Sequence, residues 1–188
     1  MKVIIEMKDN IEDNKKDDNI IELIKENENY CLVFKKYNFK ALAYIGKNGL
    51  TLHHYEGDQK TQKGVFQLGV ALGTHDYSDV KTNLNYMKIN PNLYWVDDIN
   101  SIYYNKLIDF TITKTGWKSG EHLIDFPKQY EYAIEIKINP KNIRGNGSAV
   151  FIHCFGSNNY TSGCIAIDRV KIIELLSLVD KSTVLKIK

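Results

Sequence analysis

Residues 149–167 read AVFIHCFGSNNYTSGCIAI, two short apolar runs separated by a polar loop. The first run carries His153, and Cys164 opens the second run directly after Ser162 and Gly163. Apolar runs of this length, bounded by glycine and small polar residues, are typical of buried β-strands. A strand, a loop and a second strand would bring His153 and Cys164 side by side.

The same pattern of short strands continues on both sides of this stretch. Residues 170–179 have the apolar spacing of a helix. The other periodic segments predict strands at residues 30–35, 38–46, 64–72, 130–138 and 182–187. Many strands, few helices and no regular alternation between them indicate a mainly β domain rather than a parallel α/β sheet.

The composition is that of an ordinary globular domain. The chain has 188 residues, of which 43% are hydrophobic and 26% charged, so it can bury a core without a disulfide framework. Its 25 Lys and Arg against 23 Asp and Glu give a net charge of +2, so we expect no nucleic-acid partner. The apolar runs are too short to span a bilayer, and no secretory signal is recognisable, so the chain is expected to be cytoplasmic or to lack its export signal.

Residues 1–29 differ from the rest in being polar and rich in charge. Within them, residues 17–25 place four apolar residues in a helix-compatible cluster after acidic residues that suit a helix start. We therefore expect a polar N-terminal segment or short helix over residues 1–29, followed by one catalytic domain over residues 30–188.

A cysteine beside a histidine is a candidate nucleophile and base, because the imidazole assists formation of the thiolate. Backbone amides at Gly163 and Cys164 would then be placed to donate to a developing oxyanion. A half-buried thiol and a core histidine would give the same pattern, and from the residues alone the two readings stay open. Cys154 follows His153, so strand alternation turns it to the opposite face, and His53 and His54 are expected to be exposed.

Several stretches of the chain, in the same order, resemble the L,D-transpeptidase catalytic domain, the YkuD-like family. The family's signature is a histidine on a strand followed by a Ser-(His/small)-Gly-Cys turn, which residues 153–164 match. Residues 56–69 (EGDQKTQKGVFQLG) resemble its polar turn and following strand, and residues 94–105 and 121–133 resemble a bacterial branch. The resemblance implies a β-sandwich of this catalytic type with one or two peripheral helices.

The resemblance also implies a reaction. Cys164 would be the acyl-accepting nucleophile, activated by His153, with Ser162 and Gly163 forming the turn before it. Such enzymes cleave a peptidoglycan stem peptide, release a terminal D-amino acid and pass the acyl group to an acceptor amine. No cofactor or metal is implied, the oligomeric state stays open, and an extracytoplasmic or cell-wall location is expected. The alternatives are an L,D-carboxypeptidase or hydrolase with the same Cys–His site, and a catalytically silent wall-binding module.

Two features bear on substrate choice. Ser162 and Ala166 stand where many family members carry His and Arg or Asn, which leaves the donor and acceptor specificity open. The long polar segment over residues 77–105 is expected to cover part of the groove. Tyr94, Trp95 and Tyr104 are predicted to contact substrate, unless they cap a small β core instead. His122 is predicted to contact substrate from the wall of the cleft beside Trp117, unless it is a loop or strand histidine bonded to backbone.

Overall fold

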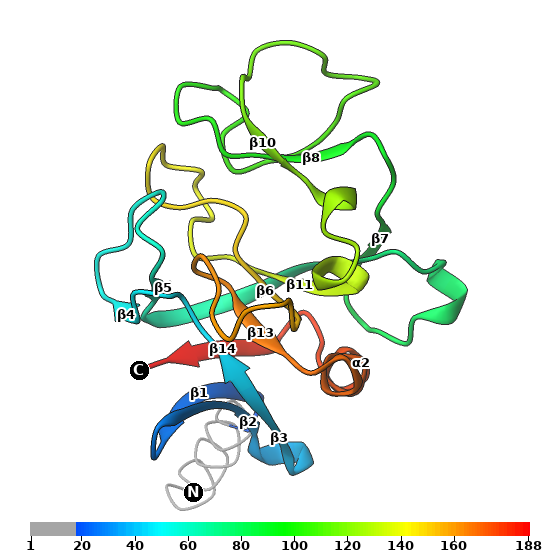
Figure 1. Cartoon of the computed structure of the whole chain (residues 1–188). Helices are drawn as coiled ribbons and strands as arrows, with labels where there is room; N and C mark the ends of the chain where they lie inside the picture. The colour runs from blue at the N-terminus through cyan, green and yellow to red at the C-terminus, as the bar shows by residue number, and fades with distance from the viewer. Residues whose placement is uncertain (1–17) are drawn as a thin grey trace, which may run out of the picture.

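The computed structural model describes residues 18–188, and its largest element is one nine-stranded sheet (Figure 1). β11 also pairs with β6, so the sheet closes on itself as a barrel-like ring and leaves β7 outside the ring. In the order in which they pair, the strands are β11 (Tyr132–Ile136), β12 (Phe151–Cys154), β13 (Ile165–Ile167), β3 (Phe39–Tyr44), β2 (Asn29–Phe34), β1 (Ile20–Glu26), β14 (Val184–Ile187), β6 (Gly64–Gly73) and β7 (Tyr86–Lys88).

Two small sheets and several short turns complete the strand structure. A three-stranded sheet pairs β10 (Gly120–His122), β8 (Leu93–Val96) and β9 (Leu107–Asp109), and it stands above the main sheet in Figure 1. The other small sheet pairs β4 (Leu50–Thr51) with β5 (Thr61–Gln62). Single 3-10 turns lie at Lys35–Tyr37, Tyr77–Asp79, Leu123–Asp125 and Gln129–Glu131.

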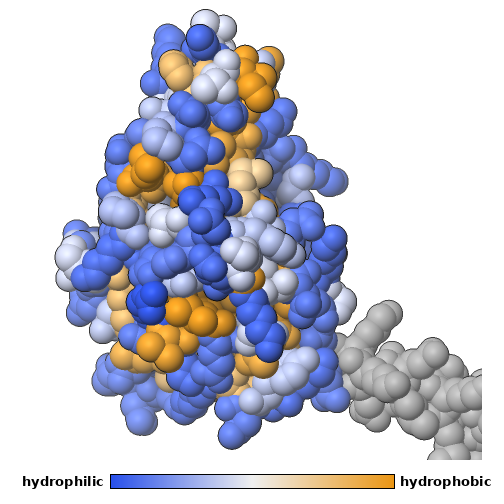
Figure 2. Space-filling model, turned by 90° about the vertical axis from the view of Figure 1, so that its right-hand side faces the viewer, coloured by the Kyte–Doolittle hydropathy of each residue, from blue (hydrophilic) through white to orange (hydrophobic). Residues whose placement is uncertain are grey.

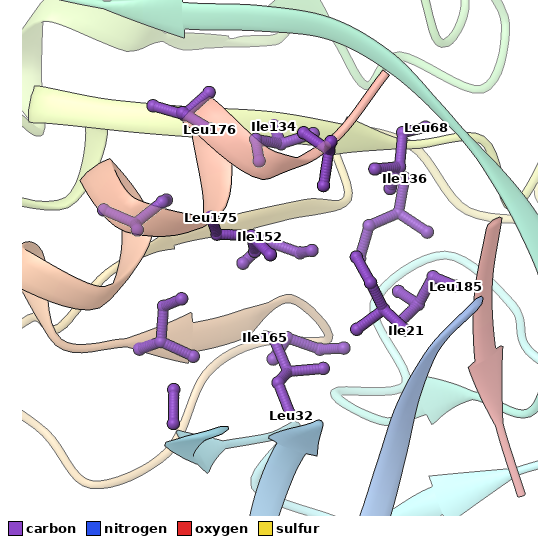
Figure 3. Packing of buried hydrophobic residues seen from close by; sticks show 14 of the residues in the cluster. Ile21, Leu32, Leu68, Ile134, Ile136, Ile152, Ile165, Leu175, Leu176 and Leu185 are labelled. Carbon is purple, nitrogen blue, oxygen red and sulfur yellow. The ribbon is translucent and has the colours of Figure 1, made fainter. Parts of the chain in front are cut away.

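Within the described part of the chain, the helix α2 (Arg169–Leu178) packs its apolar side onto the ring. Its first turn is capped by Asp168, whose carboxylate accepts from the Val170 N–H at 2.8 Å. Leu175 and Leu176 are buried and lie near Ile134 and Ile152 of the sheet (Figure 3). The helix therefore covers the apolar surface of β11 and β12, the second of which carries His153.

The surface around this core is mixed in character. On the face drawn in Figure 2, hydrophobic areas are separated from one another by hydrophilic residues. Within residues 18–188, no helix is long and apolar enough to cross a membrane.

The mainly β class predicted from the sequence is confirmed, and so are the predicted strands and the helix over residues 170–179. The β-sandwich is not confirmed, because the strand pairing describes a single barrel-like sheet. The helix expected over residues 17–25 is wrong from residue 20 onward, where β1 pairs with β2 and β14. Ile21 and Leu23 alternate into the core, and this tertiary burial overrides a local pattern that also suits a helix. The rest of the polar segment, residues 1–17, lies outside the described residues.

Candidate active site

A cavity of about 520 Å³ opens beside the junction of β12 and β13. Cys164 and His153 both line it, together with Gly163 and Ser162. The parallel pairing of β12 with β13 sets His153 opposite Ala166, two residues after Cys164. The structure thus brings all four residues predicted for the catalytic turn to one cavity.

The Cys164 thiol is held by the backbone in its resting state. The Phe151 N–H donates to Sγ at 3.3 Å, and the thiol donates to the Ala149 carbonyl at 3.4 Å. Burial raises the pKa of Cys164 to about 12, and the negative charge of Glu121 adds to this rise, whereas the Phe151 N–H opposes it. The free protein therefore holds a neutral thiol here, not a preformed thiolate.

His153 is also neutral at rest and has a defined tautomer. Its pKa is lowered because the ring is buried, although the hydrogen bond to the Cys154 carbonyl acts the other way. That carbonyl lies 2.8 Å from Nδ1 and can only accept, so Nδ1 carries the proton and Nε2 is the basic nitrogen. Among residues 18–188 no hydrogen bond joins His153 to Cys164, as is common for catalytic pairs without substrate.

The turn before Cys164 is fixed by two threonines. Thr161 Oγ1 accepts from the Gly163 N–H at 3.1 Å and donates to the Cys164 carbonyl at 2.7 Å. Thr61, on β5, donates to the Gly163 carbonyl at 2.8 Å. The Gly163 N–H is thus already engaged, which leaves the Cys164 N–H as the better placed of the two predicted oxyanion donors.

The cavity lining is acidic. Glu121 accepts a 2.6 Å hydrogen bond from Tyr130, and its pKa is raised, mainly by burial. Glu56 accepts hydrogen bonds from the hydroxyls of Tyr104 and Ser148, and Asp97 has a buried oxygen with no hydrogen-bond partner. Among the lining residues that the structure describes, none is Lys or Arg, so three carboxylates face the cavity without a fixed cation.

The aromatic residues predicted to contact substrate do not line this cavity. Tyr94 stacks on His122 with ring centroids 4.2 Å apart and also contacts Trp117, in a cluster on the small sheet. Trp95 and Tyr104 are buried, at 4% and 1% exposure. From residues 77–105, the segment expected to cover the groove, Asp97 alone contributes to the cavity lining.

Sequence reasoning missed several residues of this site. In β10 successive side chains alternate, so Glu121 faces the cavity while the predicted His122 faces Tyr94. If residues 120–122 had been recognised as a strand, this alternation would have predicted that Glu121 and His122 face opposite sides. His54, which was expected to be exposed, has a side chain only 6% exposed and lines the cavity. No local pattern marks it, because its burial depends on Gly147 and Gly163, which are distant in sequence.

The described residues hold three free cysteines, and they contain no group of three or more His, Cys, Asp or Glu arranged to hold a metal ion. No curated protein and no solved structure matches the chain. The family model of the L,D-transpeptidase catalytic domain (YkuD) matches residues 12–187, nearly the whole chain. Members of this family are L,D-transpeptidases, which act on peptidoglycan. The chain therefore belongs to the L,D-transpeptidase catalytic domain family.

Proposed function

We propose that this protein catalyses cysteine-dependent acyl transfer on peptidoglycan stem peptides, with Cys164 as nucleophile and His153 as base. One observation carries the proposal: His153 on β12 and Cys164, immediately before the parallel strand β13, line the same open cavity. The family match supports the reaction class, and the hydrogen bonds around the pair support the separate roles of the two residues.

In the first step, substrate binding draws the thiol from the Ala149 carbonyl toward His153. Nε2 takes the thiol proton as Sγ attacks the stem carbonyl, because both groups are neutral at rest and no thiolate is stored. The Cys164 N–H donates to the oxyanion that forms. The amide C–N bond then breaks, the proton passes from His153 to the departing amine, and a thioester remains on Cys164.

In the second step an acceptor amine attacks the thioester, forms a new amide bond and returns the thiol. The carboxylates of Asp97 and Glu121 favour binding of such an acceptor as a cation, because the cavity lining holds no Lys or Arg. The bound ammonium gives one proton to solvent before its free lone pair attacks. His153 takes a proton from the amine as the C–S bond breaks. This arrangement supports amine transfer over a purely hydrolytic reaction.

The test is mass spectrometry of the protein after incubation with a stem tetrapeptide. We expect an acyl adduct on Cys164 and release of the terminal D-amino acid, and no adduct on Cys164→Ala. Cys31→Ala is the matched control, because Cys31 is buried in β2 and does not line the cavity. His153→Ala should slow acylation by about 100- to 10,000-fold. Unchanged stem cleavage by Cys164→Ala would rule out the proposal.

The alternative enzyme, an L,D-carboxypeptidase, differs in how the thioester is resolved. Adding an acceptor amine should shift the product from the free acid to the cross-linked peptide, and product that stays hydrolytic at high acceptor concentration would favour the carboxypeptidase. A protein that binds the peptide without forming any adduct would instead be a silent wall-binding module.

A further inference from the structure

The cavity holds a second imidazole, His54, which the proposed reaction does not use. The His54 side chain is 6% exposed, and its Nδ1 lies 3.0 Å from Oδ1 of Asp58, whose side chain is fully buried. The two atoms are in contact, but their geometry is not that of a hydrogen bond. A buried histidine beside a buried carboxylate is thus built into the wall of the site.

Both members of the pair are fixed in place. The Asp58 carboxylate accepts from the Lys60 N–H at 2.8 Å and from the Tyr55 N–H at 3.3 Å, so it cannot turn away from the ring. The ring itself lies against two glycines at which φ is positive, Gly147 and Gly163. A methyl group at Gly147 would overlap the Nε2 edge of the ring, and one at Gly163 would lie 3.8 Å from Cε1.

The position of the ring matters because Gly163 immediately precedes the nucleophile. In the proposed acylation, the leaving residue ends in a free α-carboxylate. This carboxylate is one residue, about 3.8 Å, further along the peptide than the carbonyl that Cys164 attacks. That carboxylate must therefore come to rest close to Cys164. A charged partner for it has to belong to the immediate wall of the cavity.

His54 is the group in that wall with the right chemistry. The described lining contains three carboxylates and no Lys or Arg, so the two imidazoles are the groups there that can carry a positive charge. His153 is assigned to proton transfer, and burial favours its neutral form. His54 already faces a carboxylate at Nδ1, and its Nε2 has no hydrogen-bond partner among residues 18–188.

We propose that His54, held by Asp58, binds the α-carboxylate of the residue that leaves in the acylation step, and so restricts cleavage to the C-terminal bond of the stem. The protonated ring donates from Nε2 to the substrate and contacts Asp58 through Nδ1. This inference rests on the proposed acyl-transfer function, since it concerns the leaving residue of that reaction. His54 would thus determine specificity without taking part in proton transfer to or from Cys164.

The experiment compares two stem tetrapeptides, one with a free C-terminal carboxylate and one with a C-terminal carboxamide. With the wild-type protein, kcat/KM for acylation should be about 10- to 100-fold higher for the carboxylate, the range expected for one hydrogen bond to a charged group. In His54→Gln this preference should disappear through a higher KM for the carboxylate peptide, while the KM for the carboxamide peptide changes much less. Asp58→Asn should lose part of the preference.

His53→Gln is the matched control, because His53 is the exposed neighbour and does not line this cavity. It should keep the wild-type preference. Equal use of the two peptides by the wild-type protein would overturn the inference without any variant, and the acyl-transfer function would stand. A His54→Gln protein that loses activity on both peptides equally would also overturn it, because that result indicates a structural role. If the wild-type protein forms no adduct with either peptide, the acyl-transfer function fails, and the inference fails with it.

Discussion

Gly163 immediately precedes Cys164, and a side chain at this position would disturb the backbone that holds the thiol. Its φ of +144° is in a region that L-residues rarely adopt, and an added methyl group would meet the Lys60 carbonyl at 3.2 Å. We expect Gly163→Ala to reduce the free energy of unfolding by about 1–3 kcal/mol and to slow acylation of Cys164. Urea denaturation and the rate of adduct formation measure the two effects.

The control for this change is Gly145→Ala. Gly145 also has a positive φ, +82°, but an added methyl group would have no neighbour within 4 Å. It should cost less stability and leave acylation at the wild-type rate. Equal effects of the two substitutions would mean that backbone strain alone, and not the geometry of the catalytic turn, explains the result.

Glu121 sets the charge that the Cys164 thiol experiences. Its carboxylate raises the pKa of Cys164 in addition to the effect of burial. Replacing it by a neutral amide should therefore lower the pKa of the thiol, so that iodoacetamide labels Cys164 in Glu121→Gln at a lower pH than in the wild-type protein. The measurement is the rate of labelling against pH, and Glu174→Gln, on helix α2, is the control. An unchanged profile in Glu121→Gln would contradict the assigned effect.

The sequence identified Cys164 and His153 as the candidate catalytic pair, but not the protonation state in which the two side chains rest. The Ser-Gly-Cys turn is a local pattern, so Cys164 and His153 could be identified from it. Their surroundings include Tyr130, Phe151 and Glu121, which come from separate elements of the fold. Burial lowers the pKa of His153 and raises that of Cys164, so the two side chains are neutral at rest.

Among the elements, β1 offers the clearest test of the fold. Ile21 is fully buried between β2 and β14, whereas Lys25 on the same strand is exposed. Ile21→Ala should cost about 2–5 kcal/mol of unfolding free energy, and Lys25→Ala should change it by less than about 0.5 kcal/mol. Chemical denaturation measures both. If the two substitutions had equally small effects, residues 20–26 would not be part of the sheet.

The contrast between β1 and α2 explains why some elements were predicted and others were not. The helix over residues 170–179 has a capping Asp168 in addition to its apolar spacing, so two independent local signals agree. The segment at residues 20–26 has isoleucines and leucine in an arrangement compatible with either structure. Its parallel partner β14 lies at the other end of the chain, and no local pattern reports that pairing.

At the level of the whole molecule, the sequence does not reveal that the main sheet closes into a ring. Alternating strands predict a half-buried β-surface in a sandwich and in a barrel alike. The distinction depends on β11, which pairs with β12 on one side and with β6 on the other. This closure joins the strand that carries His153 to the rest of the ring, so His153 is held on a rigid frame.

Ionisable groups throughout the molecule predict how its stability depends on pH. On the alkaline side, burial raises the pKa of Cys164 to about 12 and that of Cys154 to about 11, from an ordinary value of 9.0. A folded-state pKa above the unfolded value means that the folded protein holds its proton more tightly. The contribution of these two thiols to the free energy of unfolding is fully present below about pH 9. It is lost as the pH rises toward 11 and 12.

On the acidic side the sign is reversed. The hydrogen bonds from Arg169 lower the pKa of Glu131 to about 2, from an ordinary value of 4.5, and hydrogen bonds also lower that of Asp180. Stability from these carboxylates is present above pH 4.5 and is lost as the pH falls toward 2. We expect the free energy of unfolding in urea to be greatest between about pH 5 and pH 8. Cys164→Ala should reduce the loss of unfolding free energy at alkaline pH (the alkaline limb of the pH profile) and leave the acidic side unchanged. Glu131→Gln should reduce the loss at acidic pH and leave the alkaline side unchanged. An alkaline limb that stays equally steep in Cys164→Ala would show that the thiol is not buried as described, and the neutral resting pair would then have to be abandoned.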